Sequence, residues 1–293
     1  MTGEQPPNLD PGPGPGEENP PASSEAPPEA EHRESGLIPL SILSASEPTP
    51  PELAPSPRQP ERDPFWGYGD LFLFFGLAVP ALLLGVGLVK GAEAIFHLHF
   101  AAKAIEPIAE QLIGYLLLFG ALKVLFRIEY NRPFWRSLGW SGLRIPFLAV
   151  VVCGIGAAFV VALIGAMVSV RNTPNAITDL MRDKTSMIVL AVFGITLGPI
   201  SEELAFRGFL QPLLVRSLGA AAGIILAAIP FGLLHYQEYG NSWPHAAIVA
   251  AAGVAFGCMR HFTGSTKAAA LMHAAYNALF FAVVAFGPNQ LPQ

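Results

Sequence analysis

Seven stretches of roughly 20 apolar residues follow one another through the chain, and a helix needs about that length to cross the hydrocarbon core of a bilayer. Charged residues, glycine or proline separate the stretches. The pattern predicts an all-α fold, a polytopic membrane helix bundle of about seven transmembrane helices. The predicted spans are Asp70–Val89, Pro107–Phe126, Pro146–Val170, Met187–Arg207, Gly219–His235, His245–Arg260 and Lys267–Phe286.

Composition agrees with this class, because 52% of the 293 residues are hydrophobic and only 13% are charged. Residues 1–64 differ from the rest, since they hold most of the 28 prolines and an excess of acidic side chains. Such a segment buries too little apolar surface to fold alone. We therefore predict a disordered acidic, proline-rich tail at 1–64 and a transmembrane domain at 65–293. The tail lacks the basic region and apolar core of a signal peptide, so we expect the first span to serve as the targeting signal.

Basic residues are biased towards one side of the predicted bundle. Cytoplasmic loops of membrane proteins are enriched in lysine and arginine. The bias predicts a multi-pass membrane protein with a cytoplasmic N-terminus, in the cytoplasmic membrane if the cell is bacterial. Charges at span ends, such as Asp70 and Glu238, are expected to be solvated. The loop after the second span carries Arg127, Arg132, Arg136 and Arg144.

Two adjacent carboxylates and a guanidinium interrupt the fourth apolar run, at Glu202, Glu203 and Arg207. Glu203 precedes Arg207 by four residues, which is the favoured order for an ion pair on one helix face. Glu202 is then a free carboxylate, and ionisable groups inside a membrane usually mark function. Gly198-Pro199 just upstream can break the helix and admit water or an extended substrate. The alternative for the charge cluster is an interfacial salt bridge at a helix end.

Further polar side chains lie in two later spans: His235, which follows Phe231 by four residues, and His273 with Asn277. An antiparallel hairpin of ideal helices sets Glu202 and His235 at the same depth, because both are equally far from the turn between their spans. A carboxylate beside an imidazole can deprotonate water, and a second imidazole with an amide can donate hydrogen bonds to an oxyanion. This arrangement is typical of a hydrolase. Interhelical hydrogen bonding is the structural alternative for each residue taken alone.

Three motifs now stand in order: Glu-Glu-x-x-x-Arg at 202–207, Phe-x-x-x-His at 231–235 and His-x-x-x-Asn at 273–277. Together they resemble the CPBP family of intramembrane endopeptidases, which includes the CAAX prenyl proteases and bacteriocin-processing or bacteriocin-immunity proteins. The resemblance covers about 134–286 and leaves the tail unexplained. It implies cleavage of a peptide bond in a membrane-associated or lipidated protein or peptide.

Carried onto this chain, the resemblance implies that Glu202 with His235 activates the attacking water. It also implies that His273 with Asn277 stabilises the tetrahedral oxyanion. The expected partners are the lipid bilayer and a protein or peptide substrate. The supporting residues of the motifs are Glu203, Arg207 and Phe231.

Metal dependence is open at this stage, because the family is often termed metalloprotease. Glu202, His235 and His273 would supply three ligands of a catalytic zinc and leave one position for water. We favour a mechanism without a metal cofactor, since Asn277 is a poor zinc ligand but a good oxyanion donor. The chain has no credible phosphate-binding loop, so we expect neither a nucleotide nor a nucleic-acid partner.

Two non-proteolytic classes compete with the enzyme. A transporter would use paired intramembrane acids and histidines, but the common type shows repeated halves with broken helices, and no such repeat is visible in the sequence. A membrane-binding or bacteriocin-immunity protein would use the same fold. It would not need all four of Glu202, His235, His273 and Asn277.

Overall fold

The computed structural model describes residues 63–168 and 175–286. All of them lie in one compact unit, which spans Arg58–Gln293. They form helices joined by turns, without a strand in the described ranges. The predicted all-α membrane bundle is therefore confirmed. The predicted tail at 1–64 lies outside the described residues, apart from its last two.

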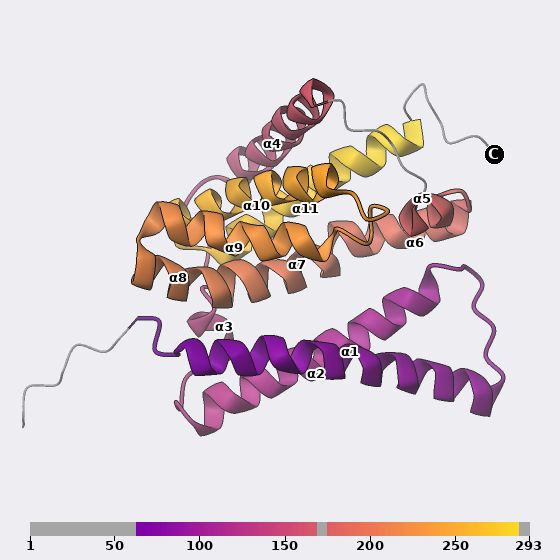
Figure 1. Cartoon of the computed structure of the whole chain (residues 1–293), viewed down its shortest axis with the longest axis horizontal. Coiled ribbons are helices and arrows are strands. Elements are labelled where there is room, and N and C mark those ends of the chain that lie inside the picture. The colour runs from indigo at the N-terminus through magenta and orange to yellow at the C-terminus, as the bar shows by residue number, and fades with distance from the viewer. Residues whose placement is uncertain (1–62, 169–174, 287–293) are drawn as a thin grey trace, which may run out of the picture. The chain divides into compact units, whose positions relative to one another are not determined.

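The helices follow the predicted spans closely, and Figure 1 colours them in chain order from indigo at α1 to yellow at α11. One stretch inside the fourth apolar run, named η2, is a π-helix. The elements are α1 (Tyr68–Phe96), α2 (Ile105–Ile128), α3 (Phe134–Ser137), α4 (Phe147–Met167), α5 (Ala176–Met181), α6 (Lys184–Ile195), α7 (Leu197–Glu203), η2 (Leu204–Leu210), α8 (Gln211–Leu218), α9 (Ala220–Leu234), α10 (Trp243–Thr263) and α11 (Thr266–Phe286).

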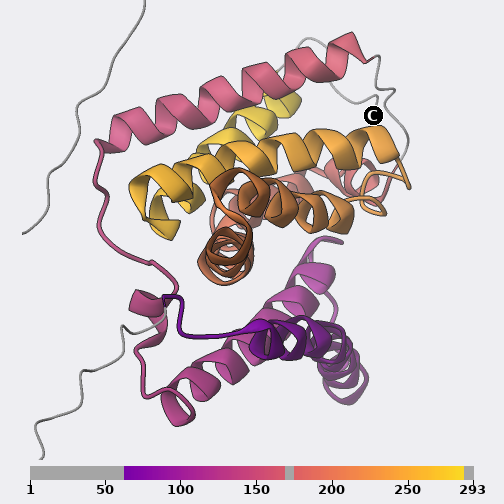
Figure 2. The same ribbon diagram turned by 60° about the vertical axis from the view of Figure 1, so that its left-hand side comes forward.

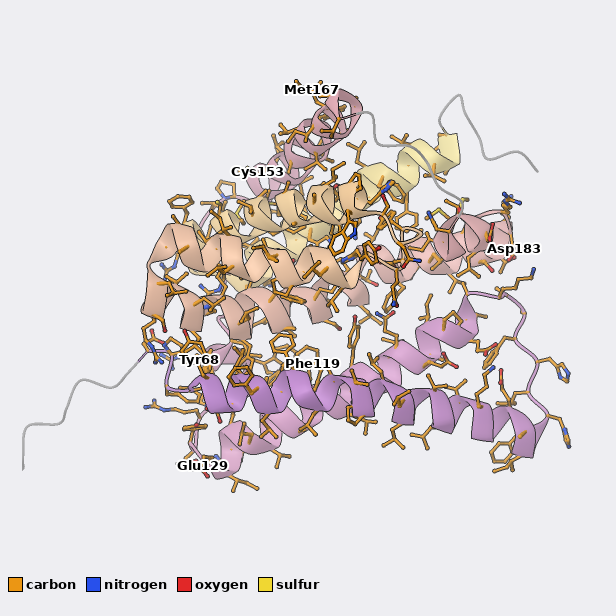
Figure 3. The ribbon with its side chains drawn as sticks, in the orientation of Figure 1. Tyr68, Phe119, Glu129, Cys153, Met167 and Asp183 are labelled. Atoms are coloured by element: carbon orange, nitrogen blue, oxygen red, sulfur yellow. The ribbon has the colours of Figure 1, made fainter. Side chains whose placement is uncertain are left out.

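In the described ranges, 6 helical stretches are long and apolar enough to cross a membrane. One of them, Lys184–Leu218, combines α6, α7, η2 and α8. The fifth predicted span corresponds to α9, which is apolar but only 15 residues long. Large apolar side chains point away from the bundle, among them Met167 on α4, which is 78% exposed (Figure 3). Such an outer surface suits contact with lipid.

The motif-bearing helices meet around α11. This helix contacts α4 and α10, and it also contacts α6, α7 and η2. Helix α9 packs against α8 and α10, while α1 and α2 form a hairpin. Figure 2 shows that hairpin and α4 on different sides of the α8–α10 layer. The carboxylates of α7, His235 directly after α9 and His273 of α11 are thereby brought to one region.

The fourth apolar run breaks where its proline requires it. Pro199 has no N–H, and its ring would collide with the carbonyl of Ile195 in a continuous helix. The backbone leaves helical geometry at Thr196, with φ −120° and ψ −89°, so α6 ends and α7 begins there. The Thr196 hydroxyl donates to the carbonyl of Val192 at 2.5 Å. The interruption predicted from Gly198-Pro199 is therefore confirmed, shortly before these two residues.

The π-helix η2 directly follows α7. Its hydrogen bonds join residues five apart, as in Gln211 N–H to the Phe206 carbonyl. Two of its carbonyls accept hydrogen bonds from side chains elsewhere in the chain: Phe209 O from Trp66 Nε1 at 3.1 Å and Arg207 O from Arg260 Nε at 3.2 Å. The irregular turn is thus fixed by its surroundings, since buried carbonyls need such partners.

We expect deletion of residues 1–59 to leave membrane insertion and catalysis intact. The deletion keeps Trp66, which is 2% exposed and stacks on Phe126 and Phe209 at 5.3 Å. A longer deletion, of residues 1–67, removes this side chain and should lower the melting temperature, because loss of a buried Trp typically costs about 3–5 kcal/mol. Thermal unfolding and activity in detergent measure both effects. Loss of activity after the shorter deletion would show that the tail recruits substrate or reaches the site.

Candidate active site

The buried ion pair of Glu203 and Arg207 lies next to the site but does not line its cavity. Both side chains have no exposed surface, and Arg207 Nη1 donates to Glu203 Oε1 at 2.9 Å. The pair predicted from their spacing is therefore confirmed, although π-helical geometry begins between the two residues. Burial of both charges requires each to be compensated.

Aromatic rings and one backbone carbonyl complete the surroundings of Arg207. Its Nη2 donates to the carbonyl of Gly253 at 2.7 Å, and its guanidinium lies 4.3 Å from the ring centroid of Phe231. Such stacking suits a desolvated guanidinium. A Cβ at Gly253 would lie 2.9 Å from Nη2 and from the Phe231 ring, so a larger residue does not fit there. Phe231 therefore supports the ion pair directly.

His273 lies between the two glutamates of α7. Its Nδ1 is 3.1 Å from Glu203 Oε1, and its Nε2 is 3.9 Å from Glu202 Oε2. The ring stacks on Phe256 with centroids 4.5 Å apart. Because a carboxylate accepts hydrogen bonds, Nδ1–H donates to Glu203 and Nε2 faces Glu202. Glu203 therefore orients His273 as well as compensating Arg207, a contact that the sequence did not predict.

His235 has a different carboxylate partner from the one expected. Its Nδ1 lies 2.9 Å from the Phe231 carbonyl, which only accepts, so Nδ1–H is the donor and the neutral ring keeps a lone pair on Nε2. This Nε2 lies 3.7 Å from Glu238 Oε2. The expected direct contact with Glu202 is wrong: in the described residues the imidazole that pairs with Glu202 is His273. The reason is that the π-helix at 204–210 lies between the two residues and shifts the ideal-hairpin register.

Glu238 is an exposed boundary charge, as expected, but it also lies at the site. Its side chain is 42% exposed, yet it lines the same cavities as Glu202 and His235. Desolvation by the surrounding protein raises the pKa of Glu238. The nearby His235 lowers this pKa, and the negative charge of Glu202 raises it further. The spacing of three residues between His235 and Glu238 could have indicated this contact in the sequence. It was missed because Glu238 was assigned to a loop, where helical spacing is not expected.

Two cavities meet at these residues. The first has a volume of about 330 Å³ and includes His273 and Asn277 in its lining. The second has a volume of about 410 Å³ and extends between α1, α2 and η2, where Phe74, Phe119 and other apolar side chains line it. The wall shared by both cavities consists of Gln111, Glu202, Phe231, His235 and Glu238.

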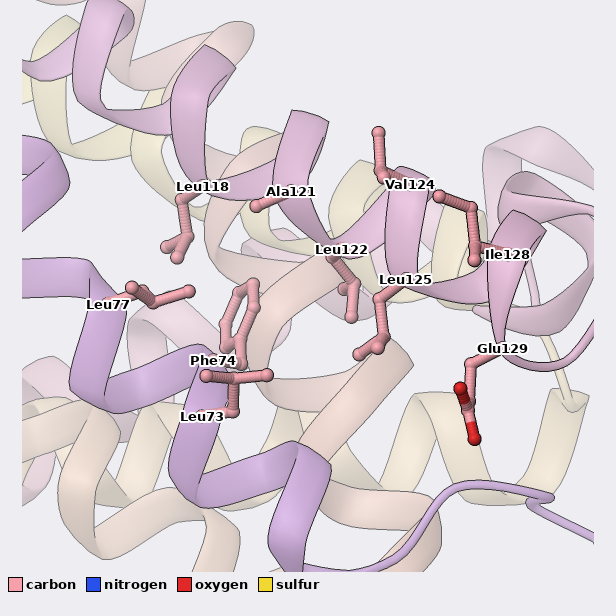
Figure 4. Close-up of a pocket in the computed structure, with 10 residues that line it drawn as sticks. All are labelled: Leu73, Phe74, Leu77, Leu118, Ala121, Leu122, Val124, Leu125, Ile128 and Glu129. Carbon is pink, nitrogen blue, oxygen red and sulfur yellow. The ribbon is translucent and has the colours of Figure 1, made fainter.

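A third cavity, of about 330 Å³, lies in the groove between α1 and α2 (Figure 4). Its lining is hydrocarbon except for Glu129 at one end. None of the predicted site residues lines it. We therefore do not assign the chemistry to this groove.

Asn277 joins α11 to the end of α6. Its Nδ2 donates to the Gly194 carbonyl at 2.7 Å, and its side chain also lines the first cavity. One amide N–H is thereby held by protein, and an amide has a second to offer. All four predicted catalytic residues line this cavity, whereas Glu203 and Arg207 lie buried behind it.

The alternative zinc set does not converge in this structure. The Nδ1 atoms of His235 and His273 are engaged by the Phe231 carbonyl and by Glu203. Over the described ranges, no three His, Cys, Asp or Glu side chains are grouped so that they could hold a metal ion. Both Nε2 atoms stay available, and metal-ligating histidines commonly have their other ring nitrogen held in this way, so the metal-free mechanism and the zinc alternative both stay predictions.

A multi-pass helix bundle that gathers carboxylates, imidazoles and an amide at one cavity is the arrangement expected of an intramembrane hydrolase. Residues 184–279 match the family model described as "Rce1-like: Type II CAAX prenyl endopeptidase Rce1-like". Over this stretch, which contains all three motifs, the chain is similar to the CPBP/CAAX protease family, and the resemblance of the motifs is confirmed. No curated protein and no solved structure matches the chain.

Proposed function

We propose that this protein is an intramembrane endopeptidase that cleaves a peptide bond in a membrane-associated or lipidated protein or peptide. The observation that carries the proposal is the convergence of Glu202, His235, His273 and Asn277 on one cavity. These residues come from three separate helical regions, and packing alone gives no reason for polar groups to meet inside a membrane bundle. The family match supports endopeptidase activity at the level of the family.

In the proposed reaction, Glu202 and His235 bind the attacking water between them. Both side chains line both cavities, so one water molecule at the shared wall can contact both. The lone pair on His235 Nε2 accepts one hydrogen bond from the water, while Glu202 takes the proton as the new C–O bond forms. The tetrahedral intermediate then carries its negative charge on the former carbonyl oxygen.

His273 and Asn277 are proposed to stabilise that oxyanion. The His273 ring lies between the carboxylates of Glu202 and Glu203. A ring with two N–H groups would therefore donate to Glu203 through Nδ1–H and present Nε2–H to the cavity. The remaining N–H of Asn277 is a second donor. Fixed donors of this kind stabilise developing charge without reorganisation. Collapse breaks the C–N bond, and the proton on Glu202 passes to the leaving amine.

The direct test is a comparison of protein termini in membranes from cells with the wild-type protein and cells with Glu202→Ala. We expect new N- and C-termini that depend on the intact carboxylate and lie within or beside membrane anchors or lipidated tails. Equal expression of both proteins is the control. Identical sets of termini would favour a non-proteolytic membrane-binding or immunity role for the same fold.

Chelation separates the metal-free mechanism from the zinc alternative. We expect activity to survive dialysis of the purified enzyme against a strong chelator, because Glu202 and His235 need only suitable protonation states to activate water. Zinc content measured on the same sample should be far below one per chain. Activity that is lost on chelation and restored by zinc, with zinc content lowered by His273→Ala, would recast His273 as a ligand.

A further inference from the structure

The turn after α9 places an acidic side chain beside His235. The N–H of Tyr239 donates to the carbonyl of His235 at 3.1 Å and closes a helical turn. Residues three apart on such a turn share a face, which sets Glu238 next to the imidazole. His235 Nε2 and Glu238 Oε2 are 3.7 Å apart.

Aromatic contacts fix this turn to the beginning of α10. Tyr236 packs against Trp243 with ring centroids 4.5 Å apart, and Tyr239 stacks on His245 at 5.2 Å with an interplanar angle of 8°. The loop that carries Glu238 is thereby anchored on both sides of that residue. A packed anchor of this kind defines the position of a side chain better than a free loop does.

The opposite edge of the His235 ring is also fixed, since its Nδ1–H donates to the Phe231 carbonyl. Only Nε2 is left to face the cavities, and it faces Glu238. A distance of 3.7 Å is too long for a direct hydrogen bond, and both atoms are acceptors, but one bridging water can donate one hydrogen to Nε2 and the other to Glu238.

We propose that Glu238 is a positioning residue for His235 and that the site consists of two carboxylate–imidazole pairs, Glu202 with His273 and Glu238 with His235. This inference rests on the proposed endopeptidase function. Through the bridging water, Glu238 keeps the Nε2 edge of the ring turned towards the shared cavity wall, so that the Nε2 lone pair is in place when the attacking water replaces the bridging one. It acts through His235 and does not itself take the water's proton, which passes to Glu202.

Steady-state kinetics of the full chain in detergent test this proposal, with an internally quenched peptide that ends in a prenylated CAAX sequence as the probe. We expect Glu238→Gln to lower kcat at least about tenfold, a smaller loss than that of an acid–base group itself. KM should change by less than about threefold, because substrate contacts remain. Glu238→Asp, which keeps the charge, should recover part of kcat. The matched control is Gln237→Ala in the same loop.

The panel also contains Glu202→Gln, so that two failures can be told apart. An active wild type with an inactive Glu202→Gln and an unimpaired Glu238→Gln would remove the positioning role alone. Wild-type cleavage no faster than that of Glu202→Gln would remove the proposed function and this inference with it. A Glu238→Gln loss that Glu238→Asp does not relieve, accompanied by an equal fall in melting temperature for both, would reassign Glu238 to folding.

Discussion

Glu202→Ala and His235→Ala should each lower kcat/KM by at least about 10²-fold while the protein remains inserted and folded. The two side chains act on one water molecule, so loss of either removes the same proton transfer. Both are partly exposed to the cavity and are not in the buried core. Their removal therefore leaves the packing of α7 and α9 largely unchanged. Peptide cleavage and thermal unfolding in detergent measure the two properties separately.

Matched controls come from the same residue types elsewhere in the chain. Glu129 lies at the end of the apolar α1–α2 groove, and His261 lies near the end of α10; neither lines the site cavities. Glu129→Ala and His261→Ala should keep wild-type activity. Full activity of a well-folded Glu202→Ala protein would rule out this carboxylate as the base and the mechanism built on it.

The parts of the fold and site that depend on local spacing were predictable from sequence. The length of each apolar stretch identified the helices, because the thickness of the bilayer sets how many residues a membrane-spanning helix needs. The Glu203–Arg207 pair followed from a separation of four residues, and it forms at 2.9 Å. The break before Pro199 followed from the missing N–H. Each of these inferences needs only neighbours in the chain.

The partner of each histidine was not predictable in the same way. Ideal helices placed Glu202 opposite His235, but the chain between them becomes π-helical at 204–210, which shifts the register between α7 and α9. His273 reaches Glu203 only because α11 packs against α7. Long-range packing decides such contacts, and periodicity in the sequence does not report it.

Arg207→Ala is expected to destabilise the protein by about 3–5 kcal/mol, because it leaves the Glu203 carboxylate buried and uncompensated. Arg207 also contributes a hydrogen bond to the Gly253 carbonyl and stacking on Phe231, and both are lost with it. Most of the variant should therefore be unfolded or degraded at growth temperature. Expression level and melting temperature in detergent report this loss.

Glu203→Gln separates stability from chemistry at the same pair. Glutamine keeps the shape but removes the charge that compensates Arg207 and that accepts from His273 Nδ1. We therefore expect a lower melting temperature together with lower kcat, because a neutral amide oxygen holds His273 Nδ1–H more weakly than a carboxylate does. A variant that is as stable as wild type but inactive would place Glu203 among the groups that act on the reaction, and would refute its role in the buried ion pair.

The double variant Glu203→Gln/Arg207→Met provides the decisive comparison. In the described residues, Glu203 Oε2 and Arg207 Nε have no hydrogen-bond partner, so the native pair is incompletely satisfied. Replacing both members of such a pair with uncharged side chains is often neutral or stabilising, whereas removing one is not. We expect the double variant to melt well above Arg207→Ala yet to remain catalytically impaired, since His273 still lacks its carboxylate. Recovery of activity along with stability would show that Glu203 serves only to compensate Arg207.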